Sequence, residues 1–314
     1  MLAGLEPAFY SARPPPSVLS DKRHSALRSL LGGLIDYAGL FPPGCLTMDA
    51  VVRNYGSYIR GEHGWMMGRL IVPANCLAEY EEVVRTAQVD ASAWRLAVLA
   101  TTADVGRVTR FNADKRARFG EIDVLEVKAA NAREIHDTAL ACEGYQLYFE
   151  TPPETWRSLL PAIGVAHARA KIRTGGPVAE AIPEESRVLE FLRIAGERRV
   201  AFKATAGLHH PLRAMQRLTY KPDSPEAVMH GFLNVFCAAV LLWHEPALRQ
   251  EAAWMLGERD ADAITMDQMS MTWHNSGVTL TAEQIQEARA QFCIGFGSCS
   301  FTEPIQDLGA LGWL

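Results

Sequence analysis

The stretch that decides the fold is residues 170–211, AKIRTGGPVAEAIPEESRVLEFLRIAGERRVAFKATAGLHHP. It predicts a strand that carries Lys171 and Arg173, a glycine turn, a helix, and a second strand that carries Lys203 and Thr205. Residues two apart on a strand share a face, so each pair of side chains points to one side of its strand. A helical crossover between neighbouring parallel strands brings their carboxyl ends to one edge, where ligands of α/β folds bind. We therefore place the candidate active site at this edge.

The same alternation of strand and helix extends over most of the chain. We expect strands at residues 34–38, 69–72, 95–100, 123–128, 146–150, 170–173, 200–205 and 294–300, with helices between them, for example at 77–86 and 131–142. Nearly continuous apolar strands separated by helices are typical of a parallel sheet covered on its faces. Eight such units predict an α/β fold of the (β/α)₈ TIM-barrel type. The alternative is a doubly wound open sheet, although no glycine fingerprint for a dinucleotide follows the first strand.

The remaining segments predict additions to one barrel domain. Residues 1–30 are expected to form an N-terminal arm with three consecutive prolines and a first helix, and residues 31–314 the barrel. After the seventh strand, residues 207–225 are too long for an ordinary connection and predict a loop that covers the strand ends. We expect a helix at 225–243 capped by Ser224, a helix at 246–256, an irregular stretch at 264–277, and a helix from Thr281, whose spacing from Gln284 is that of a capping box.

Composition narrows the class of protein. The chain has 314 residues, 48% hydrophobic and 21% charged, which is enough to bury a large core. A formal charge of -5 and the lack of basic runs argue against a nucleic-acid partner. No signal peptide is recognisable, and the longest apolar run, 235–243, is too short to span a membrane, which takes about 20 residues. Six cysteines without CxxC spacing indicate reduced thiols, so we expect a cytoplasmic protein; the apolar segment 232–243 is either core or the interface of a homo-oligomer.

Charged residues recur on the face of each strand that should point into the barrel. Alternation directs Glu126 and Lys128 inward on one strand, and Tyr148 and Glu150 inward on the next. With Lys171, Arg173 and Lys203, this gives four cations against two carboxylates near one rim. Burying an unpaired charge costs several kcal/mol, so the excess predicts a small substrate with a carboxylate or phosphate group. The alternative is that Glu126–Lys171 and Glu150–Arg173 are structural ion pairs and the other lysines reach solvent.

Lys203 is the candidate catalytic residue. Among other cations and apolar walls a lysine has a lowered pKa, and a neutral amine can attack a carbonyl to form a Schiff base. Lys128 and Lys171 would supply the repulsion, and Glu126 or Glu150 would be the general base. The alternative is that Lys203 binds an anion and does not react. The candidate substrate-binding residues are Lys171, Arg173, Thr174, Gly175, Gly176, Thr205, His209 and His210, with the glycine amides available to an anion.

Two further candidates lie beyond the strands. Adjacent histidines diverge, and His209–His210 lacks HExxH or HxH spacing, so we expect no metal and no other cofactor, and a histidine that orients a substrate oxygen. Cys299 lies at the end of the last strand and is either a nucleophile or a packed thiol. Glu303 is expected to cap a helix or pair locally.

Several short patterns resemble the deoxyribose-phosphate aldolases, which are Schiff-base barrel enzymes. FKATAGL at 202–208 resembles that family's KTSTGF motif, which contains the reactive lysine, and AKIRTGG at 170–176 resembles its preceding LKVIIET strand. LIDYAGLFPP at 34–43, in which Asp36 lies near a strand end, resembles the opening LIDHTLL, and EIDVLEVKA at 121–129 resembles EIDMVIN. The resemblance implies that Lys203 forms the Schiff base and that Asp123 corresponds to the catalytic aspartate.

This sequence also departs from the family. The family's second lysine, on the strand after the reactive one, has no counterpart, and the strand QLYFETP at 146–152 is additional. Asp123 pointing inward would also turn Glu126 and Lys128 outward in a regular strand. We therefore expect a barrel enzyme of the lyase or aldolase type acting on a small anionic carbonyl compound. The alternatives are an isomerase or lyase that stabilises an enolate without a covalent bond, and a non-catalytic barrel that binds a small molecule.

Overall fold

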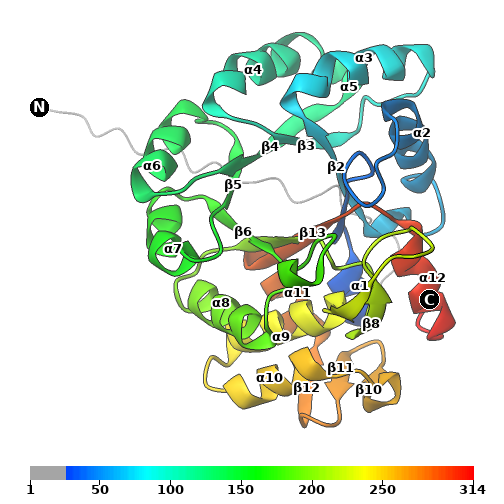
Figure 1. The fold of residues 1–314 in the computed structure, drawn as a ribbon, viewed down its shortest axis with the longest axis vertical. Coiled ribbons are helices and arrows are strands. Elements are labelled where there is room, and N and C mark those ends of the chain that lie inside the picture. The colour runs from blue at the N-terminus through cyan, green and yellow to red at the C-terminus, as the bar shows by residue number, and fades with distance from the viewer. Residues whose placement is uncertain (1–25) are drawn as a thin grey trace, which may run out of the picture.

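Eight parallel strands close into a barrel in the computed structural model, which describes residues 26–314 (Figure 1). Around the barrel the order is β1 (Ile35–Tyr37), β2 (Met67–Pro73), β3 (Arg95–Leu99), β4 (Glu121–Lys128), β5 (Gln146–Glu150), β6 (Arg169–Arg173), β7 (Phe202–Thr205) and β13 (Cys293–Ser298), which pairs with β1. The predicted (β/α)₈ fold is confirmed, and each of the eight predicted segments overlaps a barrel strand. The predicted arm at residues 1–20 lies outside the described residues.

Helices surround the barrel (Figure 1). They are α1 (Ala26–Leu31), α2 (Met48–Tyr58), α3 (Leu77–Thr86), α4 (Val105–Asp114), α5 (Arg116–Phe119), α6 (Ala132–Ala141), α7 (Trp156–Val165), α8 (Glu185–Glu197), α9 (Phe232–His244), α10 (Arg249–Gly257), α11 (Ala282–Gln291) and α12 (Thr302–Ala310). The helices predicted at 77–86 and 131–142 are confirmed, and the second is capped by the Asn131 side chain, which accepts a hydrogen bond from the Glu134 amide. The capping box of Thr281 and Gln284 is also present at the start of α11.

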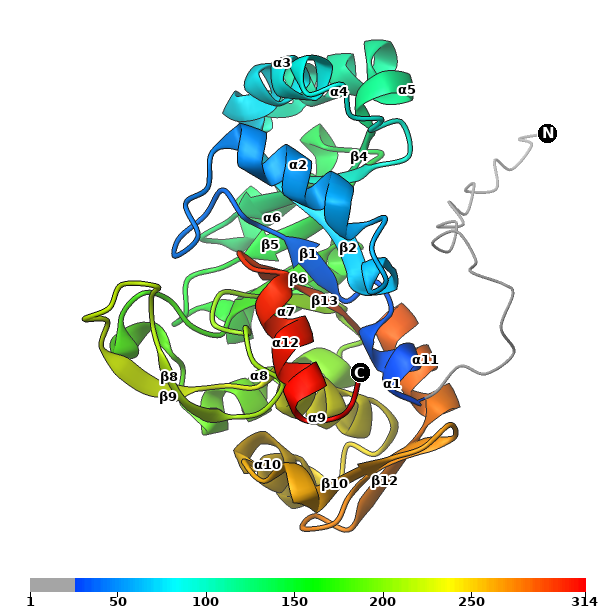
Figure 2. The same cartoon turned by 90° about the vertical axis from the view of Figure 1, so that its right-hand side faces the viewer.

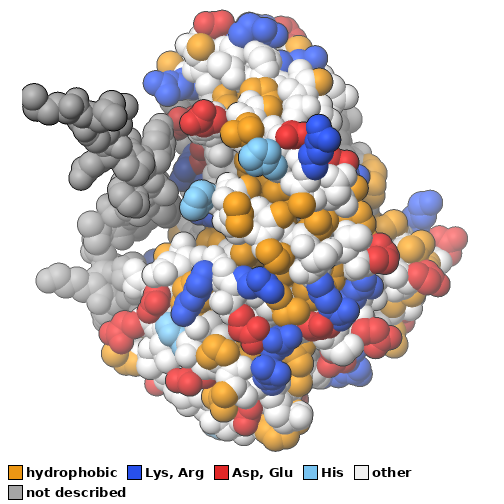
Figure 3. Space-filling view, turned by 90° about the vertical axis from the view of Figure 1, so that its left-hand side faces the viewer, with side chains coloured by type: hydrophobic (Ala, Val, Ile, Leu, Met, Phe, Trp, Pro, Cys, Tyr) orange, Lys and Arg blue, Asp and Glu red, His pale blue; other side chains and the backbone are white. Residues whose placement is uncertain are grey.

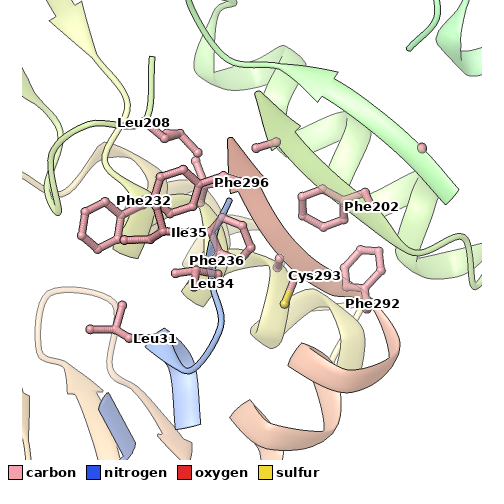
Figure 4. Close-up of a cluster of buried hydrophobic side chains, with 14 of the residues drawn as sticks. Leu31, Leu34, Ile35, Phe202, Leu208, Phe232, Phe236, Phe292, Cys293 and Phe296 are labelled. Carbon is pink, nitrogen blue, oxygen red and sulfur yellow. The ribbon is translucent and has the colours of Figure 1, made fainter. Parts of the chain in front are cut away.

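Helix α9 is buried within the chain, so its apolar surface is part of the core. All residues from Phe232 to Trp243 are buried. On one side Phe236 packs in an aromatic cluster with Phe202 of β7 and Phe296 of β13 (Figure 4). On the outer side α10 and a small antiparallel sheet cover the helix (Figure 2). A helix that is apolar all round is therefore explained here by burial within the chain.

That small sheet corrects the prediction of an irregular stretch at residues 264–277. Strands β10 (Ile264–Met266), β11 (Ser270–Trp273) and β12 (Val278–Thr281) pair antiparallel in this order. Met271, Trp273, Val278 and Leu280 are buried, while Thr272 and Thr279 face outward and share a hydrogen bond between hydroxyls. The alternation is that of a sheet with one face on the core, but each strand is too short to be recognised from sequence.

The loop predicted after the seventh strand contains a hairpin, and the helix predicted to start at residue 225 begins later. Strand β8 (Ala214–Arg217) pairs with β9 (Glu226–Met229), and α9 starts only at Phe232. Ser224 does not cap this helix, because its hydroxyl accepts a hydrogen bond from the Thr219 amide across the hairpin turn, at 2.9 Å. The hairpin projects from the molecule beyond α12 (Figure 2).

The outer surface shows mixed charge where the figures display it. On the face turned to the viewer in Figure 3, Lys and Arg side chains are interspersed with Asp and Glu side chains. Charges of both signs placed close together cancel at a distance, so this face has no continuous basic surface. Among residues 26–314, none of the helices combines the length and apolar character that crossing a membrane requires.

Candidate active site

Lys203 lies inside the barrel between two carboxylates. On β7, Phe202 and Ala204 pack outward in the main core, and the alternation of the strand turns Lys203 inward. Its side chain is only 2% exposed, and its Nζ lies 2.6 Å from Asp36 Oδ2 and 2.5 Å from Glu126 Oε1. The Nζ also lies 5.6 Å from the centre of the Tyr148 ring, which forms one wall. The predicted inward positions of Lys203, Glu126 and Tyr148 agree with this arrangement.

A line of alternating charges runs on from this pair. Lys171 Nζ lies 2.8 Å from Glu126 Oε2 and 2.9 Å from Glu150 Oε2, and Arg173 Nη2 lies 2.9 Å from Glu150 Oε1. We refer to the set as the charge chain, which comprises, in order of contact, Asp36, Lys203, Glu126, Lys171, Glu150 and Arg173. Side-chain exposure rises from 2% at Lys203 through 7% at Lys171 to 46% at Arg173. The charge chain therefore connects the barrel interior with the surface.

The carboxylates fix the charge of Lys203. Burial by itself lowers the pKa of Lys203, but Asp36 and Glu126 outweigh it and raise this pKa above its ordinary value. Burial likewise raises the pKa of Glu126, but the ammonium groups of Lys203 and Lys171 outweigh it and hold this pKa at about 2. The pKa of Glu150 is lowered in the same way, with burial outweighed by Lys171 and Arg173. At neutral pH these groups are all charged.

Two predictions about charge are therefore wrong. The lowered pKa of Lys203 is wrong because the groups nearest its Nζ are carboxylates and not cations. The excess of positive charge is wrong for the charge chain, since Asp36 supplies a third carboxylate against three cations. Lys128 is exposed, and none of the ion pairs described for residues 26–314 includes it. The alternative of structural ion pairs proposed Glu126–Lys171 and Glu150–Arg173. Both ion pairs are present, and they are joined to each other in the charge chain.

Asp36 is the functional candidate that sequence reasoning did not include. Its Oδ2 contacts Lys203, and its Oδ1 accepts a hydrogen bond from the backbone amide of Arg69 at 2.6 Å. A side chain at Gly68 would place its Cβ 2.2 Å from Asp36 Oδ1, so any larger residue here would displace the Asp36 carboxylate. The only sequence feature that marked Asp36 was its place near the end of a short apolar strand.

A second set of ion pairs lies inside the barrel around Asp123. Arg69 Nε and Nη2 donate to the two carboxylate oxygens of Asp123 at 2.6 and 2.7 Å, and Arg95 also pairs with it. The pairing of β3 with β4 passes from Ile122 to Val124, so Asp123 is an extra residue in a β-bulge. The bulge lets both Asp123 and Glu126 point inward, which a regular strand would forbid. The expected conflict between these two positions is therefore wrong.

The loops after β6 and β7 hold each other through the residues predicted to bind substrate. The Thr174 hydroxyl donates to the carbonyl oxygen of Ala206 at 2.6 Å, and Thr174 is buried. Gly175 packs on Gly207, since a Cβ on Gly175 would lie 2.8 Å from the Gly207 Cα. Gly176 is close to Ala181 in the same manner, and Thr205 faces the barrel interior opposite Gly297. Thr174 and the glycines thus have a structural role that accounts for their presence.

The two histidines face different partners beside α12. His209 Nδ1 lies 3.1 Å from Glu303 Oε2, and His210 Nδ1 lies 2.6 Å from Asp307 Oδ2. Glu303 was predicted to cap a helix or pair locally, but its side chain contacts His209 and Tyr220, which are distant in the sequence. His209 Nε2 faces the thiol of Cys299 at 4.0 Å. The candidate residues therefore separate into the charge chain and a smaller group around Cys299.

Neither a search for metal sites nor comparison with known proteins assigns a role to any further residue. Within the described part of the chain, no three His, Cys, Asp or Glu side chains are arranged to hold a metal ion. Comparisons with protein-family models, with curated proteins and with solved structures found no match for this chain.

Proposed function

We propose that this chain is a lyase of the aldolase type that binds a small anionic carbonyl compound and activates it through Lys203. The observation that supports the proposal is the position of Lys203, buried in the barrel with carboxylates at 2.6 and 2.5 Å from its Nζ. A buried amine with two adjacent proton acceptors has the parts that Schiff-base formation requires.

The charge balance of the site suits an iminium ion. When a lysine ammonium and a carbonyl compound condense, the products are a protonated Schiff base and one water molecule, so the positive charge remains at the same nitrogen. The carboxylates of Asp36 and Glu126 that stabilise the ammonium therefore also stabilise the iminium. The lysine has to be neutral only while its amine attacks the carbonyl carbon. This requires one proton to leave Nζ for a short time.

Asp36 and Glu126 are placed to take that proton. Either carboxylate can accept it along an existing contact with Nζ and return it to the hydroxyl of the carbinolamine, which then leaves as water. Glu126 also contacts Lys171, so a proton on Glu126 has a second cation beside it that favours its release. Glu150, the next carboxylate of the charge chain, is nearer the surface and is the candidate base for a proton of the bound substrate.

The exposed end of the charge chain is the candidate site for the anionic group of the substrate. Arg173 is 46% exposed and its guanidinium has donors beyond those that reach Glu150. Arg guanidinium groups bind carboxylate and phosphate through paired hydrogen bonds. Lys128 is exposed at the end of β4, and its residue pairs with Glu150 in the sheet, so it adds a cation at the same rim.

The raised pKa of Lys203 favours one alternative. An ammonium that stays protonated would stabilise an enolate by charge and hydrogen bonding without forming a covalent bond. Both mechanisms labilise the hydrogen next to the substrate carbonyl and both require the cation at residue 203. They differ in whether a bond to Nζ forms, which reduction by borohydride reveals.

Exchange of that hydrogen tests the shared part of the proposal. The protein is incubated in D2O with a panel that includes pyruvate, dihydroxyacetone phosphate and glyceraldehyde 3-phosphate, and loss of the proton signal is followed by NMR. We expect exchange of at least one compound, its loss in Lys203→Met, and its retention in Lys115→Met, where a lysine outside the barrel pairs with Glu81. Equal exchange by Lys203→Met and the parent protein would refute the role of Lys203.

A further inference from the structure

Four side chains from separate segments meet at the end of β13, and we call them the thiol cluster: Cys299, His209, Tyr220 and Glu303. The Cys299 Sγ lies 4.0 Å from His209 Nε2 and 3.5 Å from the Tyr220 hydroxyl. His209 Nδ1 lies 3.1 Å from Glu303 Oε2, and Tyr220 donates to the same oxygen at 2.7 Å. The thiol thus faces an imidazole whose opposite nitrogen is held by a carboxylate. The proposed Lys203 chemistry uses none of these groups.

The surroundings favour the ion pair of thiolate and imidazolium. Burial by itself raises the pKa of Cys299, but His209, Tyr220 and the backbone amide of Gly44 outweigh it and lower this pKa. Burial lowers the pKa of His209, but its contacts with Cys299 and Glu303 outweigh this and raise the pKa to about 9. The sulfur therefore has two donors directed at it, His209 Nε2 and the Gly44 amide, and it lies 3.5 Å from the Tyr220 hydroxyl, whose one proton goes either to the sulfur or to Glu303.

The other charged and titratable groups near the sulfur do not oppose this state. Tyr37 of β1 is one of these groups, and burial raises its pKa to about 12, so it is neutral. The pKa of Tyr220 is also raised, first by burial and then by Cys299 and Glu303. The pKa of Glu303 is lowered because His209 and Tyr220 outweigh its burial, and His210 adds to this effect. The thiol cluster is therefore a line of a thiol with a lowered pKa, an imidazole with a raised pKa and a carboxylate with a lowered pKa.

Access to the sulfur is narrow. Cys299 is 7% exposed, so a large electrophile cannot reach Sγ without movement of its neighbours. A cavity of about 410 Å³ lies next to the cluster and is lined by the β8–β9 hairpin together with Tyr220, Glu303 and His210. Tyr220 lines this cavity, is 54% exposed and contacts the sulfur through its hydroxyl, so it is the side chain that a small molecule such as hydrogen peroxide would have to displace to pass from the cavity to Sγ.

We propose that Cys299 is a peroxide-reactive thiolate and that His209 is its proton donor. The sulfur attacks one oxygen of hydrogen peroxide or a small organic hydroperoxide, and the O–O bond breaks. The leaving hydroxide or alkoxide takes the proton from His209 Nε2. The products are a sulfenic acid on Cys299, a neutral imidazole, and one molecule of water or alcohol, so the sulfur is oxidised and the peroxide is reduced.

The remaining cysteines provide the comparison. Burial raises the pKa of the thiols of Cys76, Cys142, Cys237 and Cys293, which makes them poor nucleophiles. Cys45 is exposed and is an accessible reference thiol in the same molecule. Oxidation confined to Cys299 would therefore reflect its surroundings and not its exposure.

The test is to oxidise the intact protein with one equivalent of hydrogen peroxide, trap the sulfenic acid with dimedone, and locate the adduct by peptide mass spectrometry. Near pH 6, where an ordinary thiol of pKa about 8.5 is roughly 0.3% thiolate, Cys299 is expected to react at least ~10-fold faster than Cys45. A parallel sample carrying Cys45→Ser removes the thiol adjacent to Gly44, so that this thiol cannot consume the sulfenic acid. Oxidation of Cys45 with Cys299 left reduced would overturn the proposal, and so would an unmodified Cys299 in the Cys45→Ser sample.

Variants separate a specific mechanism from general oxidation. His209→Asn is expected to lower the rate at Cys299 by at least ~10-fold near pH 6 and by less at higher pH, where the thiol ionises without help. His274→Asn is the matched control, because His274 is exposed and bonds to Thr265 elsewhere in the fold. If His209→Asn does not fold, Tyr220→Phe is measured in its place. In Tyr220→Phe the rise in the oxidation rate of Cys299 with pH should occur at higher pH than in the parent protein. An unchanged pH profile in the folded variant would contradict the proposed role of the cluster.

Discussion

Replacing Lys203 by methionine tests the charge chain through stability. Methionine fills a similar volume without a charge, so Lys203→Met leaves the carboxylates of Asp36 and Glu126 buried beside an apolar side chain. Removing one partner of a buried ion pair typically costs about 3–5 kcal/mol. The fall in the pKa of Glu126 from 4.5 to about 2 corresponds to a net stabilisation of about 3 kcal/mol, which remains after the opposing effect of burial and which Lys203 shares with Lys171. We expect a loss of this size in the free energy of unfolding near pH 7.

The loss should depend on pH with a definite sign. In the parent protein the folded pKa of Glu126 is below its unfolded value, so its stabilising contribution is present above about pH 4.3 and falls only below it. Without Lys203 the buried carboxylates repel, and the pKa of one of them should rise above its unfolded value. Protonation of that carboxylate as the pH is lowered then removes the repulsion and makes the variant less unstable. The difference in stability between Lys203→Met and the parent should therefore be smaller near pH 5 than near pH 7.

The assay is urea unfolding followed by circular dichroism at both pH values. Lys115→Met is the matched control, since Lys115 forms an ion pair with Glu81 at the surface and should lose less than about 1 kcal/mol. The double variant Lys203→Met/Glu126→Gln removes one charge of each sign, and we expect it to be more stable than Lys203→Met alone near pH 7. A loss below about 1 kcal/mol for Lys203→Met, or a loss that does not change with pH, would refute this description of the buried charges.

Three further predictions concern the scaffold around the site. Gly207→Ala should lower the free energy of unfolding, measured in urea, by at least about 2 kcal/mol. The reason is that residue 207 has a φ of +78° and its Cβ would lie 2.8 Å from the Gly175 Cα. An unchanged free energy of unfolding would contradict this packing. Thr281→Ala should cost about 1 kcal/mol by removing the capping box with Gln284, and Thr281→Ser should recover most of it in the same assay. Acid titration followed by circular dichroism should show stability falling from about pH 4.5 towards pH 2 as Glu126 is protonated, and stability unchanged over this range would argue against its paired state.

The barrel could be predicted because its pattern is repeated and local. Most barrel strands are short apolar runs followed by an amphipathic helix, and eight strands spaced in this way leave few architectures open. Alternation within strands also placed Glu126, Glu150, Lys171 and Lys203 correctly in the interior. Period-two alternation depends only on neighbouring residues, so it can be read from sequence.

Features that depend on distant contacts could not be predicted. Asp36 sits on a strand of three residues, too short for alternation to show its direction, and its contact with Lys203 exists because β1 and β7 both adjoin β13. The direction of the Lys203 pKa was wrong for the same reason, since it depends on which side chains of other strands surround Nζ. The bulge at Asp123 breaks alternation at one residue, and nothing in the neighbouring sequence marks it.

The thiol cluster shows a different limit. The sequence marked His209 and Cys299 separately, but the chain between them contains a hairpin, the three helices α9, α10 and α11, a small sheet and the barrel strand β13. Tyr220 was not a candidate, because a tyrosine on an expected loop has no distinguishing pattern. Only the folded chain shows that these residues share one sulfur and one carboxylate.

The central claim is that the Nζ of Lys203 forms a covalent bond with a carbonyl substrate, and reduction by borohydride tests it most directly. The protein is incubated with each compound that undergoes exchange, reduced with sodium borohydride, and analysed by intact mass and peptide mapping. We predict an adduct of the reduced compound on Lys203 that is absent from Lys203→Met and from samples without the compound. Exchange that proceeds while Lys203 remains unmodified would contradict the covalent mechanism and leave the enolate alternative.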